Sequence, residues 1–372
     1  MKKLSRKTFF KGLALGTISL PFMIRSCGSQ NIAQESSTTL RTTKTYKWKM
    51  TTTWPPDFPG LGEGCNLFAK WVNEMSGGRM QIQVFGAGEL VPALEAFNAV
   101  RSGAAEIGHG SGYYWKGMVP AAQFFASIPF GMNAQQMNSW LISGGGMQLW
   151  EKVYGAYNLV PFPGGNSGVQ MGGWFNKEIN TIEDFKGLKM RIPGMGSTVL
   201  KKAGGAPVLL PGGEIYTGLE RGVIDATEWL SPYHDYKMGF YQIAKYYYTP
   251  GWHEPGTCLD FFINKQKFDQ LEPDLQAIIR SAAYRVNHWI LCELEAKNAI
   301  YLEKLIAEKV DIRKFPDKVL AKLRELTDEA IAEEIAEDPL SREVYASYDK
   351  FRKSTAAWGK LSEKVFYDSL QI

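Results

Sequence analysis

The hydrophobic and polar positions between residues 46 and 110 follow two alternating periods. Short runs with strand character are separated by runs in which apolar residues recur at helical spacing, as Leu90, Leu94 and Val100 do. The predicted strands are residues 47–52, 81–85 and 105–108, and the predicted helices are residues 67–75 and 90–100. Because strands alternate with helices, we expect a parallel sheet with right-handed crossovers. Ligands of such sheets gather where strands end, which points to the loops at residues 53–56 and 109–115.

A second block with the same alternation runs from about Val160 to Tyr248. Its predicted strands are residues 187–192, 206–210 and 224–229, and its predicted helices are residues 196–204 and 213–221. Beyond the block, residues 258–264 have strand character and could rejoin the first sheet. Two domains that exchange strands in this way form a hinged cleft.

A single long helix is predicted from Pro273 to about Glu308. Proline suits the first turn of a helix, and an apolar stripe runs from Leu275 to Leu294 and on towards Leu305 without an interrupting Gly or Pro. At 1.5 Å rise per residue such a helix is roughly 50 Å long and could lie across both domains. The charged, amphipathic remainder, residues 317–370, is expected to form helices on the outside.

The first residues have the order of an export signal, predicted as residues 1–26. A basic stretch without acids precedes an apolar run that is too short to span a bilayer comfortably. Residues 5–11 resemble a twin-arginine signal, but Lys7 stands where the second Arg is expected, so the ordinary secretory route stays open. Cys27 could be lipidated, or the signal could simply be cleaved. Residues 27–45 are polar and are expected to form a leader or tether.

Loss of the signal changes the charge of the chain. The whole sequence has 42 Lys and Arg against 38 Asp and Glu, and the signal holds six of the basic residues and no acid, so 36 basic and 38 acidic residues remain. Nothing therefore argues for a nucleic-acid partner. About 330 residues exceed what one core usually supports. We expect residues 46–165 plus about 249–290 to form lobe I, and residues 166–248 plus about 291–372 to form lobe II.

The stretch from Gly168 to Pro193 is the first candidate site. It places an amide, Gln170, and a guanidinium, Arg191, at the ends of two short extended segments that we expect to be joined by a turn. A planar guanidinium can donate two parallel hydrogen bonds to a carboxylate, so Arg191 is the first choice for an organic acid. The alternative is a surface ion pair between Arg191 and Asp184 or Glu183.

Oxygen donors that could hold a cation surround the same stretch. The candidates are the side chains of Gln170, Glu228 and Glu254 and the main-chain carbonyl of Trp229. Neutral oxygens combined with carboxylates suit Na⁺ or Ca²⁺. The carboxylate and the 2-oxo or 2-hydroxy oxygen of an acid could complete the coordination as a chelate. Alternatively, Gln170 satisfies strand edges and Glu228 is a salt-bridged carboxylate.

Aromatic residues could close such a pocket. Tyr113 is the favoured hydroxyl contact, and Trp54 and Trp229 are the favoured walls, because tyrosine can donate a hydrogen bond while the rings exclude water. Asn166 and His253 are further polar candidates, for which we favour structural roles. Other nearby aromatic residues stay unassigned.

Taken together, these features resemble the solute-binding subunits of tripartite ATP-independent periplasmic (TRAP) transporters. The resemblance rests on the signal, the two α/β blocks, the long helix and the segments 170–175, 187–193 and 222–226. It implies a two-lobed periplasmic solute-binding fold of the α/β class, with strand exchange between the lobes and a long helix spanning both. It also implies capture of a solute in the periplasm and delivery to a membrane permease.

The same resemblance is strongest to members that bind 2-oxo or 2-hydroxy acids together with a metal cation. It assigns the acid's carboxylate to Arg191 and the cation to Gln170, Glu228 and Trp229, with Glu254 as a weaker match. An exposed helix could also pair two copies as a homodimer.

Two other classes stay open. An exported metal-dependent enzyme acting on organic acids would need a base placed beside a nucleophile or a metal-held water. The four His residues are scattered, His253 lacks the second His of a zinc-protease helix, and residues 165–169 lack the final Gly of a nucleophile elbow. An envelope scaffold would explain export but not the predicted site.

Overall fold

The computed structural model describes residues 44–370. The predictions for residues 1–43, which concern the export signal, Cys27 and most of the polar leader, lie outside the described residues. None of the helices between residues 44 and 370 combines the length and the apolar character that crossing a bilayer requires.

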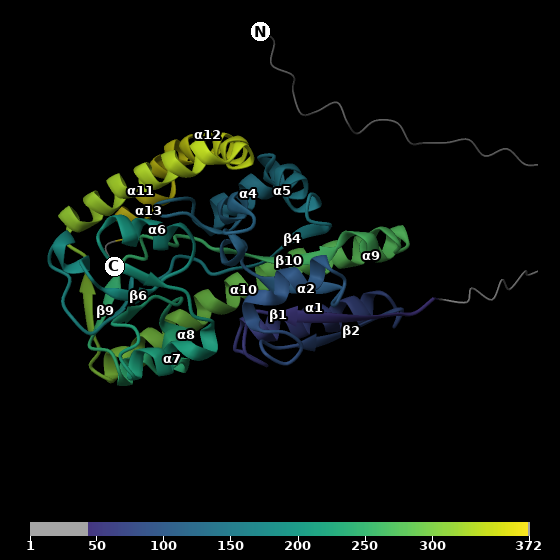
Figure 1. The fold of residues 1–372 in the computed structure, drawn as a ribbon, viewed down its shortest axis with the longest axis horizontal. Coiled ribbons are helices and arrows are strands. Elements are labelled where there is room, and N and C mark those ends of the chain that lie inside the picture. The colour runs from purple at the N-terminus through teal and green to yellow at the C-terminus, as the bar shows by residue number, and fades with distance from the viewer. Residues whose placement is uncertain (1–43, 371–372) are drawn as a thin grey trace, which may run out of the picture. The chain divides into compact units, whose positions relative to one another are not determined.

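The first sheet has five strands in the order β2-β1-β3-β10-β4 (Figure 1). The strands are β1 (Tyr46–Thr52), β2 (Met80–Phe85), β3 (Ile107–Gly110), β4 (Leu159–Asn166) and β10 (Cys258–Asn264). β1 is parallel to β2 and β3, as expected, but β10 is antiparallel to both β3 and β4, so the sheet is mixed. The return of β10 to this sheet is confirmed. The second block was wrongly predicted to open near Val160, because β4 belongs to the first sheet.

The second sheet has six strands in the order β11-β9-β5-β8-β6-β7. They are β5 (Gly173–Phe175), β6 (Lys189–Arg191), β7 (Ala206–Val208), β8 (Ala226–Thr227), β9 (Tyr246–Thr249) and β11 (Asp311–Lys314). β8 lies between β5 and β6 and is parallel to β6. The prediction that a turn joins the segments of Gln170 and Arg191 is therefore wrong. The two segments do not pair with each other, and a longer stretch of chain connects them.

Helices surround both sheets. Those before β4 are α1 (Leu61–Met75), α2 (Ala96–Arg101), α3 (Gln123–Ala126), α4 (Ala134–Ser143) and α5 (Gly146–Gly155), with 3-10 helices η1 (Ala93–Glu95), η2 (Gly112–Trp115) and η3 (Pro120–Ala122). Those that follow β5 are η4 (Ile182–Phe185), α6 (Gly194–Lys202), α7 (Gly212–Glu220), α8 (Pro232–Lys237), η5 (Phe240–Gln242), α9 (Lys265–Asp269), α10 (Pro273–Ala307), α11 (Asp317–Glu337), α12 (Pro339–Leu361) and α13 (Glu363–Ser369).

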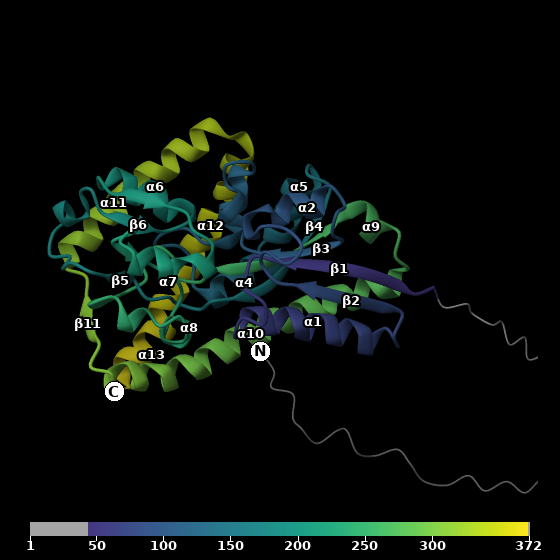
Figure 2. The ribbon, with the colours of Figure 1, turned by 60° about the horizontal axis from the view of Figure 1, so that its bottom comes forward.

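The long helix α10 is continuous, as predicted. It packs against α1 and β4 beside the first sheet and against α8 beside the second, so one helix runs along both parts of the fold (Figure 2). Close approach to α1 depends on a glycine, because a Cβ at Gly64 would lie 2.7 Å from the Cδ1 of Ile290. The boundaries predicted for the two lobes stay a prediction.

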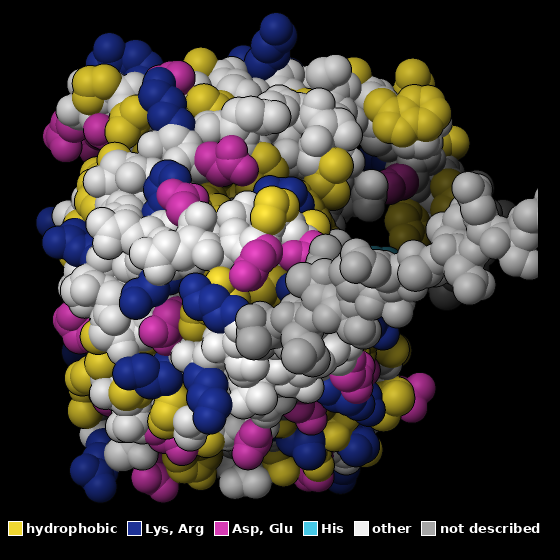
Figure 3. Space-filling model, turned by 90° about the vertical axis from the view of Figure 1, so that its right-hand side faces the viewer, with side chains coloured by type: hydrophobic (Ala, Val, Ile, Leu, Met, Phe, Trp, Pro, Cys, Tyr) yellow, Lys and Arg dark blue, Asp and Glu magenta, His cyan; other side chains and the backbone are white. Residues whose placement is uncertain are grey.

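The apolar core continues from one sheet to the other. One cluster of buried side chains joins Phe262 of the first sheet to Met190 of the second and to Leu323 and Tyr348 of the outer helices. A second cluster joins β1, α1 and α10 to Trp229. Outside this core, the face in Figure 3 shows basic and acidic side chains interspersed rather than gathered by sign.

A buried carboxyl group lies in the middle of the first sheet. Asp260 of β10 is fully buried, and its Oδ2 accepts a hydrogen bond from the hydroxyl of Tyr154 at 2.6 Å. The indole of Trp115 donates in turn to the Tyr154 oxygen at 2.9 Å, while Asp260 Oδ1 has no hydrogen-bond partner among the described residues. Burial raises the pKa of Asp260 to about 7, since the hydrogen bond from Tyr154 offsets only part of the desolvation.

This burial predicts a measurable pH dependence of stability. Because the folded-state pKa of Asp260 lies above the unfolded value of 3.8, the folded protein holds an extra proton between about pH 4 and 7, and its stability falls as pH rises through that range. The loss amounts to at most about 4 kcal/mol. Asp260→Asn should remove this component, so urea unfolding at pH 4 and pH 7 should show a smaller difference in the variant. Equal differences in both proteins would contradict the prediction.

Candidate functional site

One cavity lies where the loops of the two sheets meet. It is lined by most of the residues that the sequence nominated for substrate binding. The lining residues are Trp54, Leu61, Tyr113, Tyr114, Ser167, Gln170, Arg191, Trp229, Leu230, Thr257 and Leu259. Trp54 follows β1 and Tyr113 follows β3, which places both at the carboxyl ends of strands, as expected for such a sheet.

Arg191 ends β6, and its side chain is 1% exposed. The guanidinium forms an ion pair with the carboxylate of Glu228, donates from Nε to the carbonyl of Leu210 at 3.2 Å, and lies 3.4 Å from the hydroxyl of Tyr114. It also lies over the ring of Trp229, 5.1 Å from its centroid. The alternative of a surface ion pair with Asp184 or Glu183 is therefore wrong.

Glu228 follows β8 and is equally buried. One carboxylate oxygen pairs with Arg191, and the other lies 3.2 Å from Nε2 of His253. Its backbone N–H donates to the carbonyl of Arg191 at 3.2 Å, so the parallel strands β6 and β8 align the two charged residues. The interpretation of Glu228 as a salt-bridged carboxylate is consistent with this arrangement.

Glu254 lies close to Glu228, and both residues are buried. Its Oε2 accepts hydrogen bonds from Gln170 Nε2 at 2.8 Å and from the Thr257 hydroxyl at 2.5 Å, and Tyr113 lies at 3.5 Å. Burial raises the pKa of Glu254 to about 7, and the nearby charge of Glu228 adds to the rise. Two carboxylates this close disfavour simultaneous ionisation unless a cation joins them.

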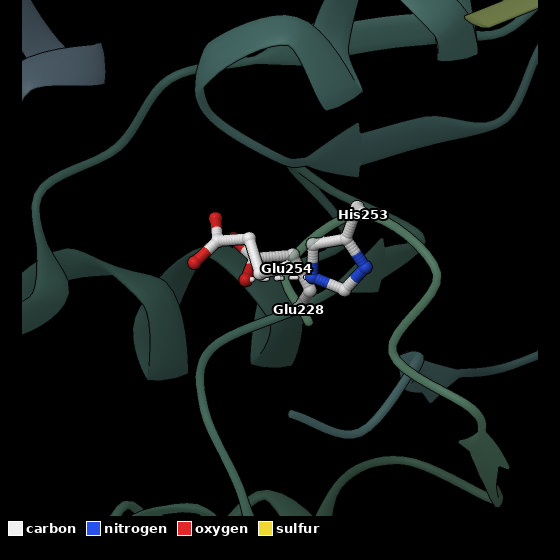
Figure 4. Close-up of side chains that lie close together, drawn as sticks. All are labelled: Glu228, His253 and Glu254. Carbon is white, nitrogen blue, oxygen red and sulfur yellow. Dashed lines mark hydrogen bonds and ion pairs between the residues drawn. The ribbon is translucent and has the colours of Figure 1, made fainter. Parts of the chain in front are cut away.

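The donor set fits a cation. Glu228, His253 and Glu254 each offer a ligand atom, and these atoms lie within 4.8 Å of one another (Figure 4). Gln170 adds a neutral oxygen, because its NH₂ group donates to Ser167 and Glu254 while its buried Oε1 has no partner among the described residues. A buried polar atom without a partner is costly, so an oxygen-seeking cation would satisfy it.

The structure brings together some candidates and separates others. Trp54 is held as a wall, since its indole donates to Nδ1 of His109 at 2.7 Å. Asn166, by contrast, is absent from the cavity lining and ties Gly256 to Gly168 through its amide. Sequence reasoning left Tyr114 unassigned and favoured a structural role for His253. The one local feature of the sequence that could have indicated a site role for His253 was the acid next to it, Glu254.

Known proteins are similar to this chain over most of its length. The family model for bacterial extracellular solute-binding proteins of family 7, DctP, matches residues 50–338. The monocarboxylate 2-oxoacid-binding periplasmic protein of Nostoc sp. is 42% identical over 317 residues, which cover 85% of this chain and 87% of that protein. Two crystal structures of TRAP periplasmic solute-binding proteins each show 42% identity and a TM-score of 0.86, and cover 88% of this chain and 100% of theirs. One, from Colwellia psychrerythraea, holds calcium and pyruvate, and the other, from Pseudoalteromonas atlantica, holds sodium and pyruvate.

The chain belongs to the DctP family of bacterial extracellular solute-binding proteins. Proteins of this family are solute receptors of TRAP transporters and not enzymes, so the reading as an exported enzyme is excluded. The two-lobed α/β fold with strand exchange and a long helix, implied by the resemblance, is confirmed.

The buried ion pair predicts a large effect of removing one charge. Glu228→Gln keeps the shape of the side chain but leaves the guanidinium of Arg191 buried without its carboxylate. Such a break typically costs about 3–5 kcal/mol of unfolding free energy. Urea unfolding of protein freed of cations should show this loss, whereas Asp269→Asn, which breaks the exposed pair with Lys265, should change stability by less than about 1 kcal/mol. Equal losses of unfolding free energy in the two variants would contradict the buried ion pair between Arg191 and Glu228.

Proposed function

We propose that this receptor binds a small 2-oxo or 2-hydroxy monocarboxylate together with Na⁺ or Ca²⁺ and delivers it to a TRAP membrane permease. The observation that carries the proposal is the contact of two buried carboxylates with two residues that line the cavity: Glu228 pairs with the guanidinium of Arg191, and Glu254 accepts from Gln170, whose amide oxygen has no partner among the described residues.

Arg191 would bind the carboxylate of the acid. Its guanidinium already holds Glu228 and lies beside Tyr114, and it can share its donors between Glu228 and an entering carboxylate. Tyr113 and Tyr114 stand on the facing wall and could donate to the second oxygen. Trp54 and Trp229 would cover the bound acid and exclude water.

The cation would bind between the acid and the protein oxygens. Gln170 Oε1, Glu228 and Glu254 would be its ligands, with the main-chain carbonyl of Trp229 as the further proposed donor. The carboxylate and the 2-oxo oxygen of the acid would complete the coordination as a chelate. The relatives with bound pyruvate and calcium or sodium support this arrangement.

Charge counting bears on the choice of cation. Glu228, Glu254 and Arg191 together carry one net negative charge when both acids are ionised, and a monocarboxylate adds a second. A divalent ion would neutralise the site completely. A monovalent ion would leave one negative charge, which a proton on Glu254 could remove because burial raises the pKa of that carboxyl to about 7.

The rest of the cavity supports an acid with a single carboxylate. Leu61, Leu230 and Leu259 contribute an aliphatic wall, and Arg191 is the sole basic side chain among the described residues that line the cavity. A second carboxylate would therefore lack a partner and would be costly to bury. The name of the Nostoc relative, a monocarboxylate 2-oxoacid-binding protein, supports the same class.

Location and partners form the outer part of the proposal. Family membership supports a periplasmic receptor that works with a membrane permease. The export signal and the anchoring of the protein through a lipid on Cys27 stay predictions, as does a homodimer. We propose that closure of the lobes on cation and acid creates the conformation that the permease recognises.

Calorimetry with pyruvate and propionate tests the chelate directly. The two acids share a carboxylate and a three-carbon skeleton, but propionate lacks the 2-oxo oxygen. We expect the protein to bind pyruvate in the presence of Ca²⁺ or Na⁺, to lose that affinity in a sodium-free buffer that contains EDTA as its potassium salt, and to bind propionate at least about tenfold more weakly, as expected for one lost metal contact or charge-assisted hydrogen bond. Equal binding of both acids, or binding unaffected by the removal of both cations, would sink the proposed chelate.

Substitution of the guanidinium tests the carboxylate contact. Arg191→Lys keeps the charge but loses the planar pair of donors, so pyruvate affinity should fall by about 10- to 100-fold. Arg221→Lys, at an exposed position after α7, is the matched control and should bind as the wild type does. Unchanged pyruvate affinity in a folded Arg191→Lys protein would reject the assignment.

A further inference from the structure

Helix α12 follows the part of the chain that the family model matches, and it carries one tyrosine deep into the fold. Tyr348 is fully buried, and its ring packs edge-on against Trp140 of α4 at a centroid distance of 5.2 Å. The helix packs against α3, α4, α5 and η3, and its place beside α4 and α5 is visible in Figure 1. None of these elements lines the ligand cavity.

The hydroxyl of Tyr348 fixes the loop between α3 and α4. It accepts a hydrogen bond from the backbone N–H of Met132 at 2.8 Å. The loop lies directly on the hydroxyl, because a Cβ at Gly131 would stand only 2.3 Å from the Tyr348 oxygen. Real Cβ atoms do not approach other atoms so closely, so Gly131 is required for this contact.

The same loop holds the segment that carries His253 and Glu254. At one end, the N–H of Phe130 donates to the carbonyl of Trp252 at 2.8 Å. At the other end, Gly256 lies against the start of α4, where a Cβ would come within 2.5 Å of the backbone nitrogen of Ala134. His253, which contacts Glu228, and the proposed cation ligand Glu254 lie between these contacts.

The loop does not adopt this shape through local preference. Phe130 has a φ of 54°, in the left-handed region that bulky residues rarely occupy. Its conformation depends on neighbours, among them the guanidinium of Arg324, which lies over its ring at 4.2 Å, and the ring of Trp252 at 6.0 Å. A strained loop persists only where its surroundings determine it, and the Tyr348 hydroxyl is one of those determinants.

We propose that Tyr348 is a positioning residue for the cation site and acts through residues 130–132 on the segment 252–256. The proposal rests on the proposed function of Gln170, Glu228 and Glu254 as a cation site. It assigns to the C-terminal helices a part in solute binding, although they supply no residue to the cavity.

Tyr348→Phe tests the proposal, because it removes the hydroxyl and keeps the ring. Calcium affinity, measured by calorimetry on chelator-treated protein with a fixed concentration of pyruvate, should fall by about 3- to 30-fold, the range expected for coupling through such a contact. Pyruvate affinity at saturating calcium should return towards the wild-type value, since the contacts of the acid are unchanged. A purely structural role would not produce this split between the two affinities.

Tyr345→Phe is the matched control. Tyr345 lies one turn earlier on α12 and packs against Tyr348 and Phe124, but no described hydrogen bond joins its hydroxyl to the loop. Calcium affinity should therefore be unchanged. The proposal is overturned if Tyr348→Phe binds calcium as tightly as the wild type, or if both variants weaken calcium binding equally.

Gly131→Ala perturbs the contact from the side of the loop and should also weaken calcium binding, by displacing the loop from the hydroxyl. Combined with Tyr348→Phe it should cost less than in the wild-type background, because the nearest clashing atom is gone, while the carbonyl oxygen of Ile128, at 2.8 Å, still crowds the added Cβ. A fully additive loss would contradict the proposed contact. Failure of the wild type to bind either calcium or sodium would refute the cation site itself, which keeps that result distinct from failure of the positioning role.

Discussion

The ion pair between Arg191 and Glu228 is the interaction on which the site depends. Both side chains are almost completely buried, and removing a charge from water costs several kcal/mol per ion unless partners replace the water. The neighbouring groups supply those partners: the Leu210 carbonyl accepts from Arg191, the Trp229 ring lies against the guanidinium, and His253 contacts Glu228. In the proposed function, an entering carboxylate and cation would exchange partners within this existing network, which would link their binding to each other.

Sequence periodicity predicted the elements that are defined by a local pattern, such as the spacing of apolar residues and the positions of Gly and Pro. Helix α10 was predicted almost to the residue because Pro273 begins it and neither Gly nor Pro interrupts it. Strand β4 escaped prediction because Pro161, Pro163 and the glycines that follow look like a loop. The structure explains how a strand can contain these prolines. β4 is the edge strand of its sheet and pairs with β10 alone, and an edge strand tolerates proline because one of its sides needs no backbone donor.

Residue chemistry found the charged members of the site, and topology determined how they meet. An amide, a guanidinium and a glutamate were sufficient to nominate Gln170, Arg191 and Glu228. Arg191 and Glu228 meet because β6 and β8 are neighbouring strands, and Gln170 contacts Glu254, which is 84 residues away in the sequence. No local sequence pattern predicts contacts between residues so far apart. The sequence did not nominate Tyr114 or His253 for the site, because an isolated tyrosine or histidine is more often a core residue with its hydrogen bonds satisfied.

The supports of the site extend further than the site itself. Burial and the charge of Glu228 raise the pKa of Glu254 to about 7, so whenever Glu254 is ionised without a cation the backbone on either side of it has to resist the repulsion between the two carboxylates. Gln170 and Thr257 restrain the carboxylate directly, while the loop at residues 128–134 restrains the chain at Trp252 and Gly256. That loop is strained at Phe130 and rests on Tyr348, which is 216 residues from Met132 in the sequence. The proposed cation site is thus built from side chains near the cavity, and its backbone is supported by a helix that never touches the cavity.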